Sequence, residues 1–332
     1  MSPRSAYGDI NQRTAAWAAT EMLAHAEPII VLSKFGQTKP LPKNKAKSVK
    51  FRRPIPFTIN TSQIQEGVTP PSHQMTYEDV PATMGQYGDI CEITDQVQDM
   101  SEDPVLQDAS ELSGEQAAET IEMLTYGVIK AGTSVYFSNG AARGDVNTPI
   151  SLNDFRMATR YLKGQRGKAV TKMMSGSVNY ETRPIEGGFI AFGHTDLEAD
   201  IRNINGFIPV ANYGSRQPLC PEELGTIEGI RIILSPLFVS WPDAGDTKGT
   251  MYSTTGTDAD VYPLIVIAKE AYGLVPLKGK EAIKPMVLNP GTPSKSDPLG
   301  QRGYVSWKAY FVAVILNDAW MTRIECAVTA LP

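Results

Sequence analysis

Between Asp103 and Ala131, apolar residues recur every three or four positions, a spacing typical of one face of a long amphipathic helix. Asp103 before Pro104 is a favourable start, because an aspartate accepts first-turn N–H groups and proline lacks a donor that this turn does not need. At the C-terminal end, Lys130 suits the negative end of the helix dipole, and Gly132 can adopt the left-handed conformation that ends a helix. The helix would be roughly 40 Å long at about 1.5 Å per residue. The predicted apolar stripe comprises Val105, Ala109, Leu112, Gln116 or Ala117, Ile121, Leu124 and Val128.

Before this helix, two extended stretches flank a polar segment. Phe51 to Ile59 alternates as a β-strand does, and Met75 to Asp99 is a second extended region. The segment between them, residues 64–73, contains Gly67 and a pair of prolines, which do not continue a strand. The pattern predicts a long hairpin with almost no apolar residues near its tip. Such a hairpin would project into water in a monomer, whereas in an assembly it can lie on a neighbouring copy.

After the helix, the pattern alternates between short helices and strands, which indicates an α/β region. Ser151 to Lys163 is the best-marked helix, since Ser151 is an N-cap residue and Asp154 stands at the capping-box position. His194 precedes another short helix, and a further one is expected over residues 9–26. Strands are expected over 134–137, 189–192, 261–268 and 273–277, a turn that leads into another strand over 222–233, and two β-rich segments over 304–316 and 320–329.

Composition places the 332-residue chain among globular proteins, with 42% hydrophobic residues and a net charge of −5. The longest apolar run, Tyr310 to Leu316, is too short to cross a bilayer, so we expect no membrane partner. The first 17 residues lack the apolar core of a secretion signal. The three cysteines are far apart in the sequence, which disfavours a disulfide scaffold.

Charge is divided into blocks along the chain. Pro28 to Gln65 contains no acidic residue, and Pro54 to Ile129 contains no basic one. Blocks of opposite sign attract where they meet, so the basic segment could contact the acidic one on another copy. Alternatively, the two blocks are simply solvated faces. The basic positions are Lys34, Lys39, Lys43, Lys45, Lys47, Lys50, Arg52 and Arg53, and the carboxylates run from Glu66 to Glu122.

Motifs for catalysis or cofactor binding are missing from the sequence. The three histidines lie in different regions, which disfavours a metal site, and neither a phosphate-binding loop nor a nucleophile elbow occurs. We therefore predict no catalytic, cofactor-binding or metal-binding residue and no enzyme. Two alternatives stay open: an α/β enzyme with a site built from scattered residues, and a nucleic-acid-binding protein acting through residues 34–53. Aromatic residues that could stack on bases are few in that segment.

Six sequence motifs, in order across most of the chain, resemble the major capsid proteins of tailed bacteriophages with the HK-97-type fold, in particular the branch of phage N4 and its relatives. One departure is His194-Thr195-Asp196, where family members often have His-Pro-Asp. The motifs are FRRPIPF and EGVTPP within 51–71, GQYGDICEITDQVQD at 85–99, FIAFGHTDLEADIRNI at 189–204, ELGTIEGIRIILSP at 223–236, VYPLIVIAKEAYG at 261–273 and DPLGQRGYVSWKAYFVAVILN at 297–317.

This resemblance implies an α+β fold of the HK-97 type with four parts. Residues 1–50 would form an N-terminal arm, 51–91 the extension-loop hairpin, 92–133 and 304–332 a peripheral domain with the long spine helix, and 134–303 an α/β axial domain. It also implies a coat protein that self-assembles into hexamers and pentamers of an icosahedral shell around double-stranded DNA. Portal, scaffold or decoration proteins would be further partners. The protein would reside in the virion capsid after assembly in the host bacterial cytoplasm.

For contacts between copies, we expect the basic segment to meet the acidic helix or the hairpin tip of an adjacent subunit. Alternatively, the helix carboxylates face the packaged DNA and keep the shell from gripping it. The candidate contact residues are Lys34, Lys47, Lys50, Arg52, Arg53, Glu66, Glu111, Glu115, Glu119 and Glu122.

Overall fold

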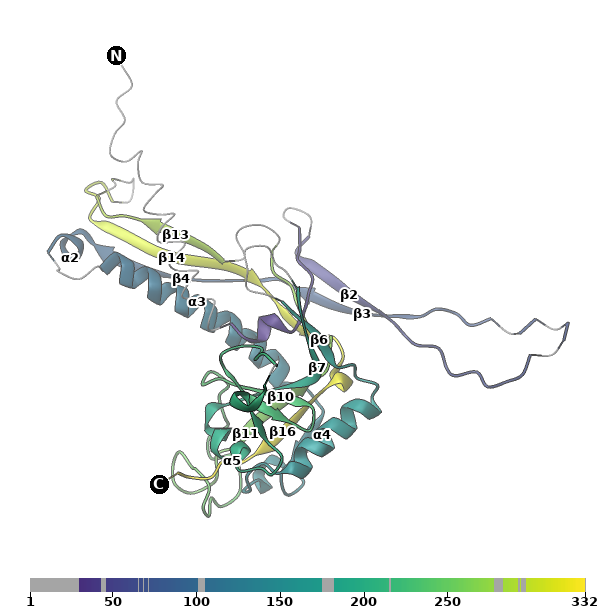
Figure 1. Cartoon of the computed structure of the whole chain (residues 1–332). Helices are drawn as coiled ribbons and strands as arrows, with labels where there is room; N and C mark the ends of the chain where they lie inside the picture. The colour runs from purple at the N-terminus through teal and green to yellow at the C-terminus, as the bar shows by residue number, and fades with distance from the viewer. Residues whose placement is uncertain are drawn as a thin grey trace.

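The computed structural model describes residues 30–331 except for 43–45, 65, 68, 71, 101–104, 175–181, 215, 278–282, 292 and 294–296. Figure 1 shows a body, a long helix with a narrow sheet that extends from it on one side, and a hairpin that projects on the other. The helix expected over 9–26 and the start signal at Asp103 and Pro104 lie outside the described residues.

The body is built on a mixed eight-stranded sheet. Its strand order is β5 (Val135–Phe137), β16 (Met321–Cys326), β11 (Tyr262–Ile267), β7 (Thr182–Gly193), β10 (Ile230–Leu234), β9 (Glu223–Ile227) and β8 (Ile208–Pro209), with β6 (Val170–Met174) paired to β7. β9 and β10 form a hairpin where the sequence analysis expected a turn followed by one strand. The expected strands over 134–137, 189–192 and 261–268 are confirmed.

Helices cover both faces of this sheet. α4 (Leu152–Gly164) and α5 (Glu198–Arg202) pack on one face through Phe155, Leu162 and Ile201. The carboxylate of Asp154 accepts hydrogen bonds from the N–H and hydroxyl groups of Ser151, each at 2.8 Å, which confirms the predicted cap. The other face receives the C-terminal half of the long helix. Short 3-10 helices lie at Arg143–Asp145, Thr195–Leu197, Val210–Asn212 and Asp318–Trp320.

The long helix, α3 (Val105–Lys130), is preceded by α2 (Asp95–Met100) and packs under a three-stranded sheet. That sheet has the order β13 (Ile283–Leu288), β14 (Arg302–Phe311) and β4 (Gly85–Thr94). The buried face of α3 consists largely of small residues such as Gly114 and Ala117, and Gln116 accepts a hydrogen bond from the Trp307 indole of β14 at 3.1 Å. Leu112, expected in the apolar stripe, is 65% exposed. The helix is confirmed, but its buried face is rotated from the expected stripe.

The root of the basic arm belongs to the body. The 3-10 helix η2 (Leu32–Lys34) packs against α3, and β1 (Gln37–Thr38) joins a small sheet with β12 (Tyr272–Leu274) and β15 (Ala313–Ile315). Val31, Leu32 and Phe35 are buried in the main core. The sequence analysis expected an extended arm over 1–50, and residues 30–42 differ because these three apolar side chains anchor them. Lys43 and Lys45 lie outside the described residues.

The predicted hairpin is confirmed. β2 (Ser48–Pro54) pairs antiparallel with β3 (Tyr77–Thr83), and the chain between them projects far from the body (Figure 1). Phe51 and Ala82, at the base of the hairpin, are buried with Leu41 of the arm and Val275 of the body. The base of the hairpin is therefore held by packing against the arm and the body, whereas its far end projects into solvent.

The sheets divide the chain differently from the expected domains at two places. β16 lies within the body sheet, between β5 and β11, although residues 304–332 were expected to complete the peripheral sheet. β13, expected in the axial domain, instead pairs with β14 beside α3. Between β14 and β16 the chain forms β15 of the small sheet and then the 3-10 helix Asp318–Trp320, so that β14 and β16 belong to different sheets.

Candidate assembly surface

The hairpin carries apolar side chains that nothing in its own body covers among the described residues. Ile59 and Ile64, closest to the tip, are 78% and 74% exposed. The sequence analysis considered the tip almost entirely polar, but the flanking residues place a row of apolar groups in solvent. Exposed apolar surface of this kind is typical of a contact site. The other exposed apolar residues of the hairpin are Ile55, Phe57, Met75 and Tyr77.

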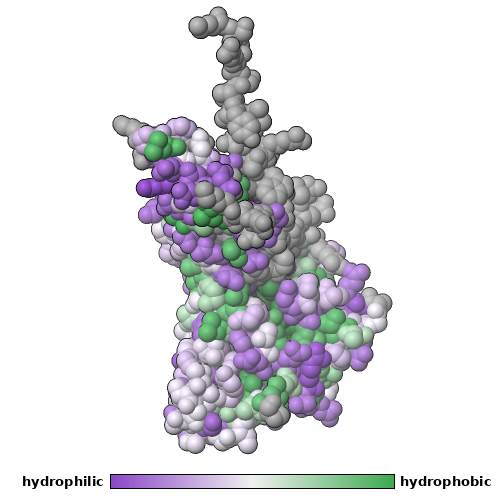
Figure 2. Space-filling model, turned by 90° about the vertical axis from the view of Figure 1, so that its left-hand side faces the viewer, coloured by the Kyte–Doolittle hydropathy of each residue, from purple (hydrophilic) through white to green (hydrophobic). Residues whose placement is uncertain are grey.

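At the opposite end of the molecule, exposed apolar residues also occur, but they are spread over several elements instead of following one another along one of them: Ile90, Val97, Leu112, Met286, Leu288 and Leu299. Figure 2 shows hydrophobic residues interspersed with hydrophilic ones over the upper part and at the lower right of this face, whereas the lower left is close to neutral in hydropathy. The hairpin is thus the part of the described chain in which exposed apolar side chains follow one another along a projecting element.

Two ion pairs cross the base of the hairpin. Arg52 lies opposite Asp79 in the strand register and donates to its two carboxylate oxygens at 2.8 and 3.0 Å. Arg53 lies opposite Glu78 and pairs with it. The hydrogen bonds from Arg52 lower the pKa of the Asp79 carboxyl. Both arginines, expected to contact another copy, therefore already have partners in their own strand pair, although the Arg52 side chain stays 62% exposed.

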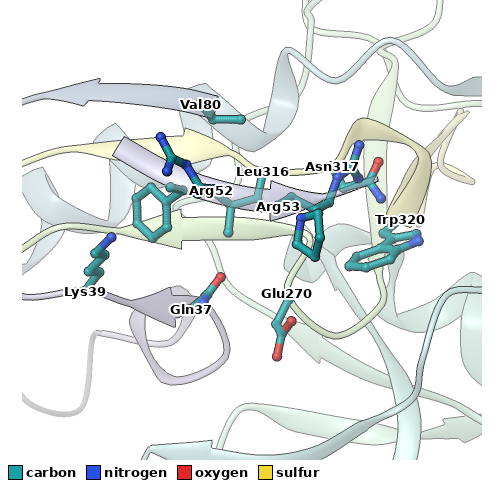
Figure 3. Close-up of a pocket in the computed structure, with 11 residues that line it drawn as sticks. Gln37, Lys39, Arg52, Arg53, Val80, Glu270, Leu316, Asn317 and Trp320 are labelled. Carbon is teal, nitrogen blue, oxygen red and sulfur yellow. The ribbon is translucent and has the colours of Figure 1, made fainter. Parts of the chain in front are cut away.

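A groove of about 320 Å³ lies where the arm, the hairpin and the body meet (Figure 3). Gln37 and Lys39 line it from the arm, Arg53 from β2, and Trp320 and Glu270 from the body. The guanidinium of Arg53 lies 6.0 Å from the centre of the Trp320 ring, a cation–π distance that ties the hairpin to the body. The groove is a structural junction with an excess of positive charge on its walls.

The remaining basic candidates surround this junction. Lys39 donates to the carbonyl of Lys50 at 2.9 Å, and its ammonium lies 5.5 Å from the centre of the Phe51 ring. Lys47 and Lys50 are exposed, whereas Lys34 is half-buried at the end of η2. The structure therefore gathers Lys50, Arg52 and Arg53 on one strand.

The acidic candidates lie elsewhere. Glu66 is exposed at the hairpin tip, and Glu119 is exposed on α3. Glu111 and Glu115 are half-buried on the same helix, where Glu111 accepts a hydrogen bond from Gln107 at 2.9 Å. Within one copy, the basic group at the hairpin base contacts Asp79 and Glu78 and not these carboxylates.

Glu122 requires a correction. It was expected to be a surface carboxylate on α3, but it is 0% exposed and its Oε1 accepts the N–H groups of Val31 and Leu32 at 3.2 and 2.8 Å. Burial raises the pKa of Glu122 to about 7, and the two N–H groups oppose this shift. The physical reason is that the arm root, some 90 residues earlier, covers this part of the helix. Glu122 binds its own chain.

Sequence analysis also missed a charged cluster at the C-terminal end of α3. Glu325, 0% exposed, accepts hydrogen bonds from Arg143 at 2.7 and 2.8 Å and from Arg323 at 2.8 Å. Arg143 and Lys130 also lie over the ring of Trp241, at 3.6 and 4.0 Å from its centre. Burial, followed by repulsion from the two arginines, lowers the pKa of Lys130 to about 8. A sequence signal was present in Arg323-x-Glu325, which share one face of a strand.

Other classes of site find no support in the part of the chain that the structure describes. His, Cys, Asp and Glu residues form no group that could hold a metal ion there. None of the described helices is long and apolar enough to cross a membrane.

Solved structures with a similar fold are phage capsids. The capsid of Ralstonia phage GP4 matches with a TM-score of 0.68 at 10% identity, covering 90% of this chain and 88% of that one. The capsid of cyanophage Pam1 matches with a TM-score of 0.63 at 13% identity, covering 93% of both chains. Cyanophage P-SCSP1u matches with a TM-score of 0.56 at 16% identity, covering 90% and 89%. These likenesses confirm the expected HK-97-type fold.

Sequence comparison leads to the same class of structural proteins. The major capsid protein of Pseudomonas phage KPP21 is 26% identical over 196 residues, which cover 54% of this chain and 49% of the relative. The chain therefore spans about half the length of this curated relative. The family described as phage capsid protein matches residues 77–324. Because this match covers well over half of the chain, the chain belongs to the phage capsid protein family.

Proposed function

We propose that this chain is a major capsid protein that self-assembles into a closed icosahedral shell around double-stranded DNA. Hexamers and pentamers would be its building units, with portal, scaffold or decoration proteins as further partners. Assembly would take place in the cytoplasm of the bacterial host, and the product would be the virion capsid. The exposed apolar hairpin is the observation that carries the proposal.

Burial of this hairpin on another copy would remove apolar surface from water. Ile59 and Ile64 are more than 70% exposed, and each would contribute about 1.5–3 kcal/mol if fully buried. The fixed base favours this role, because a hairpin held at one end loses less conformational freedom when its tip binds. A closed shell repeats the contact on every subunit, so each contact can be moderate in strength.

Charged contacts would add orientation to this apolar contact. We propose that Lys47, Lys50, Arg52 and Arg53 approach Glu111, Glu115 and Glu119 on α3 of an adjacent copy. Lys34 is half-buried and would contribute less, and Glu66 at the tip would meet basic residues of the copy that receives the hairpin. Paired charges of this kind set register and partner choice more than affinity.

A nucleic-acid-binding role for residues 34–53 has less support. Arg52 and Arg53 form ion pairs with Asp79 and Glu78, and Lys39 bonds to the backbone of its own chain. Phosphate binding would require these side chains to release such partners. Contact with packaged DNA would then be without sequence specificity.

Negative-stain microscopy of the purified chain tests the proposal. Shells, sheets or rings of five and six subunits are expected, and a uniform population of monomers at high concentration would contradict it. Ile59→Asp should abolish these assemblies while the circular dichroism of the chain stays unchanged. Ile59→Leu is the matched control, because it keeps apolar surface at the same position and should assemble normally.

A charge swap tests the role of the two arginines. Replacing both Arg52 and Arg53 with Glu should block assembly without unfolding the chain. Adding Asp79→Arg and Glu78→Arg restores the pairing within the hairpin but not a contact with another copy. Assembly that stays blocked in the fourfold variant supports a contact between copies, whereas rescue would show that the arginines act only inside the hairpin.

A further inference from the structure

The root of the arm is held on α3 by one buried carboxyl group. Glu122 Oε1 accepts the N–H groups of Val31 and Leu32, which are the N-cap and the first residue of η2. Tyr272 of β12 donates its hydroxyl to the carbonyl of Leu32 from the other side. Residues 31 and 32 are thus bound through their backbone, in addition to the burial of their side chains.

The second oxygen of the same carboxyl is orphaned. Glu122 Oε2 is buried and has no hydrogen-bond partner among the described residues. An ionised carboxylate at this position would leave a charged oxygen without compensation, which is costly in an apolar surrounding. A protonated carboxyl avoids that cost, with the proton on Oε2 and both N–H groups still donating to Oε1.

The charged and titratable groups around Glu122 come from three elements. Lys34 of η2 favours the ionised form, and Glu222, just before β9, opposes it. Burial raises the pKa of the Cys220 thiol to about 12 and that of Tyr272 well above its usual value, so both stay neutral. Glu222 also has a buried oxygen, Oε2, with no partner in the described part of the chain. The arm root therefore docks at a site where Glu222 opposes ionisation of Glu122 and Lys34 favours it.

We propose that Glu122 is a proton-controlled clasp for the arm root: residues 30–35 dock firmly on α3 when its carboxyl is protonated and loosen when it ionises. The inference concerns the single chain and does not depend on shell formation. It makes the attachment of residues 30–35 to α3 sensitive to pH.

The direction of the effect follows from linkage. A carboxyl whose pKa is higher in the docked state than in the open state binds more protons when docked, so docking is strongest at low pH. The pKa of Glu122 is raised from 4.5 to about 7. Docking should therefore weaken as the pH rises from about 4.5 to about 7 and then stay constant. At tenfold per pKa unit, the docking equilibrium should change by about 300-fold at most.

Hydrogen exchange of the full-length chain tests the clasp. Exchange of the amides in residues 30–38 is measured between pH 5 and pH 8.5 and corrected for the intrinsic rate, with the amides of β11 as an internal reference. In the wild type, protection of the arm root should fall by several tens of fold, and at most about 100-fold, while β11 stays unchanged. Constant protection of the arm root, or an equal change in β11, would overturn the proposal.

Three substitutions assign the effect to Glu122. Glu122→Gln keeps an acceptor for the two N–H groups without a charge, so its arm root should stay protected at every pH. Glu119→Gln, on the same helix but exposed, is the matched control and should behave as the wild type. Glu222→Gln removes the repelling neighbour and should move the midpoint to lower pH, which keeps the test decisive if Glu122→Gln folds poorly. A pH dependence that survives in Glu122→Gln would refute the clasp.

Discussion

Glu325 provides the sharpest test of how the body is held together. The change Glu325→Gln preserves shape but removes the negative charge that Arg143 and Arg323 share. Glu325 accepts three charge-assisted hydrogen bonds, and the single amide oxygen of a glutamine can keep only some of them. The NH₂ group would face guanidinium N–H groups, and two donors cannot bond to each other. Removing one partner of a buried ion pair typically costs about 3–5 kcal/mol, and we expect a loss in that range.

The same site couples three elements, which is why the effect should be global. Arg323 also donates to the carbonyls of Lys130 and Gly132 at the end of α3, and Arg143 lies in the 3-10 helix after β5. Urea unfolding of the unassembled chain, followed by tryptophan fluorescence and far-UV circular dichroism, measures the loss. Trp241 reports directly, because Arg143 and Lys130 lie over its ring.

Glu228→Gln is the matched control. Glu228 pairs with Arg156 at 2.9 Å, close to the 2.7 Å of the Arg143 contact, but its side chain is 37% exposed and that of Arg156 57% exposed. An exposed pair is worth at most about 1 kcal/mol, so this variant should unfold near the wild-type midpoint. The reasoning from burial would be refuted if both variants lost the same stability, or if Glu325→Gln lost less than about 1 kcal/mol.

Three further predictions concern local packing and pH. Gly88→Ala should destabilise the chain by about 1–3 kcal/mol in thermal unfolding, because the new Cβ would lie 2.5 Å from the Trp307 carbonyl oxygen. Gly127→Ala on α3 is the matched control: its Cβ has no neighbour within 4 Å, so it should stabilise the chain by about 0.5–1 kcal/mol. Equal shifts of the two variants would contradict this reasoning. Asp154→Ala should lower the urea midpoint by the equivalent of about 1–2 kcal/mol through loss of the cap at Ser151, and an unchanged midpoint would show that the cap is dispensable. The lowered pKa of Lys130 means that the unfolded chain binds more protons between about pH 8 and 10.5, so stability should rise with pH in this window for the wild type but not for Lys130→Met, as measured by urea titration at each pH.

Local signals predicted the elements whose structure depends on neighbouring residues. The cap at Ser151, the helix start after His194 and the two strands of the hairpin each follow from residues within a few positions of each other. The hairpin register pairs Arg52 with Asp79, a pairing that the sequence pattern did not indicate, because residues 55–76 separate the two paired strands.

Contacts between distant segments could not be predicted in the same way. Glu122 shares its helical face with Glu111 and Glu115, and nothing near it in the sequence shows that Val31 and Leu32 cover it. Leu112 was expected in the core on its periodicity, but the sheet above α3 packs on small residues such as Ala117. The position of β16 likewise depends on β5 and β11, which flank it in space and lie far away in sequence.

This last arrangement has a consequence for synthesis. β5 is made first, β11 follows more than a hundred residues later, and the strand that must be inserted between them is made later still. Until residues 321–326 have left the ribosome, the nascent body sheet has an open slot with two unpaired edges. Insertion of β16 also brings Glu325 to Arg143, so closure of the sheet and pairing of the buried Glu325 carboxylate with Arg143 happen in one late step. A partly made chain is thereby kept from presenting a finished body to completed copies.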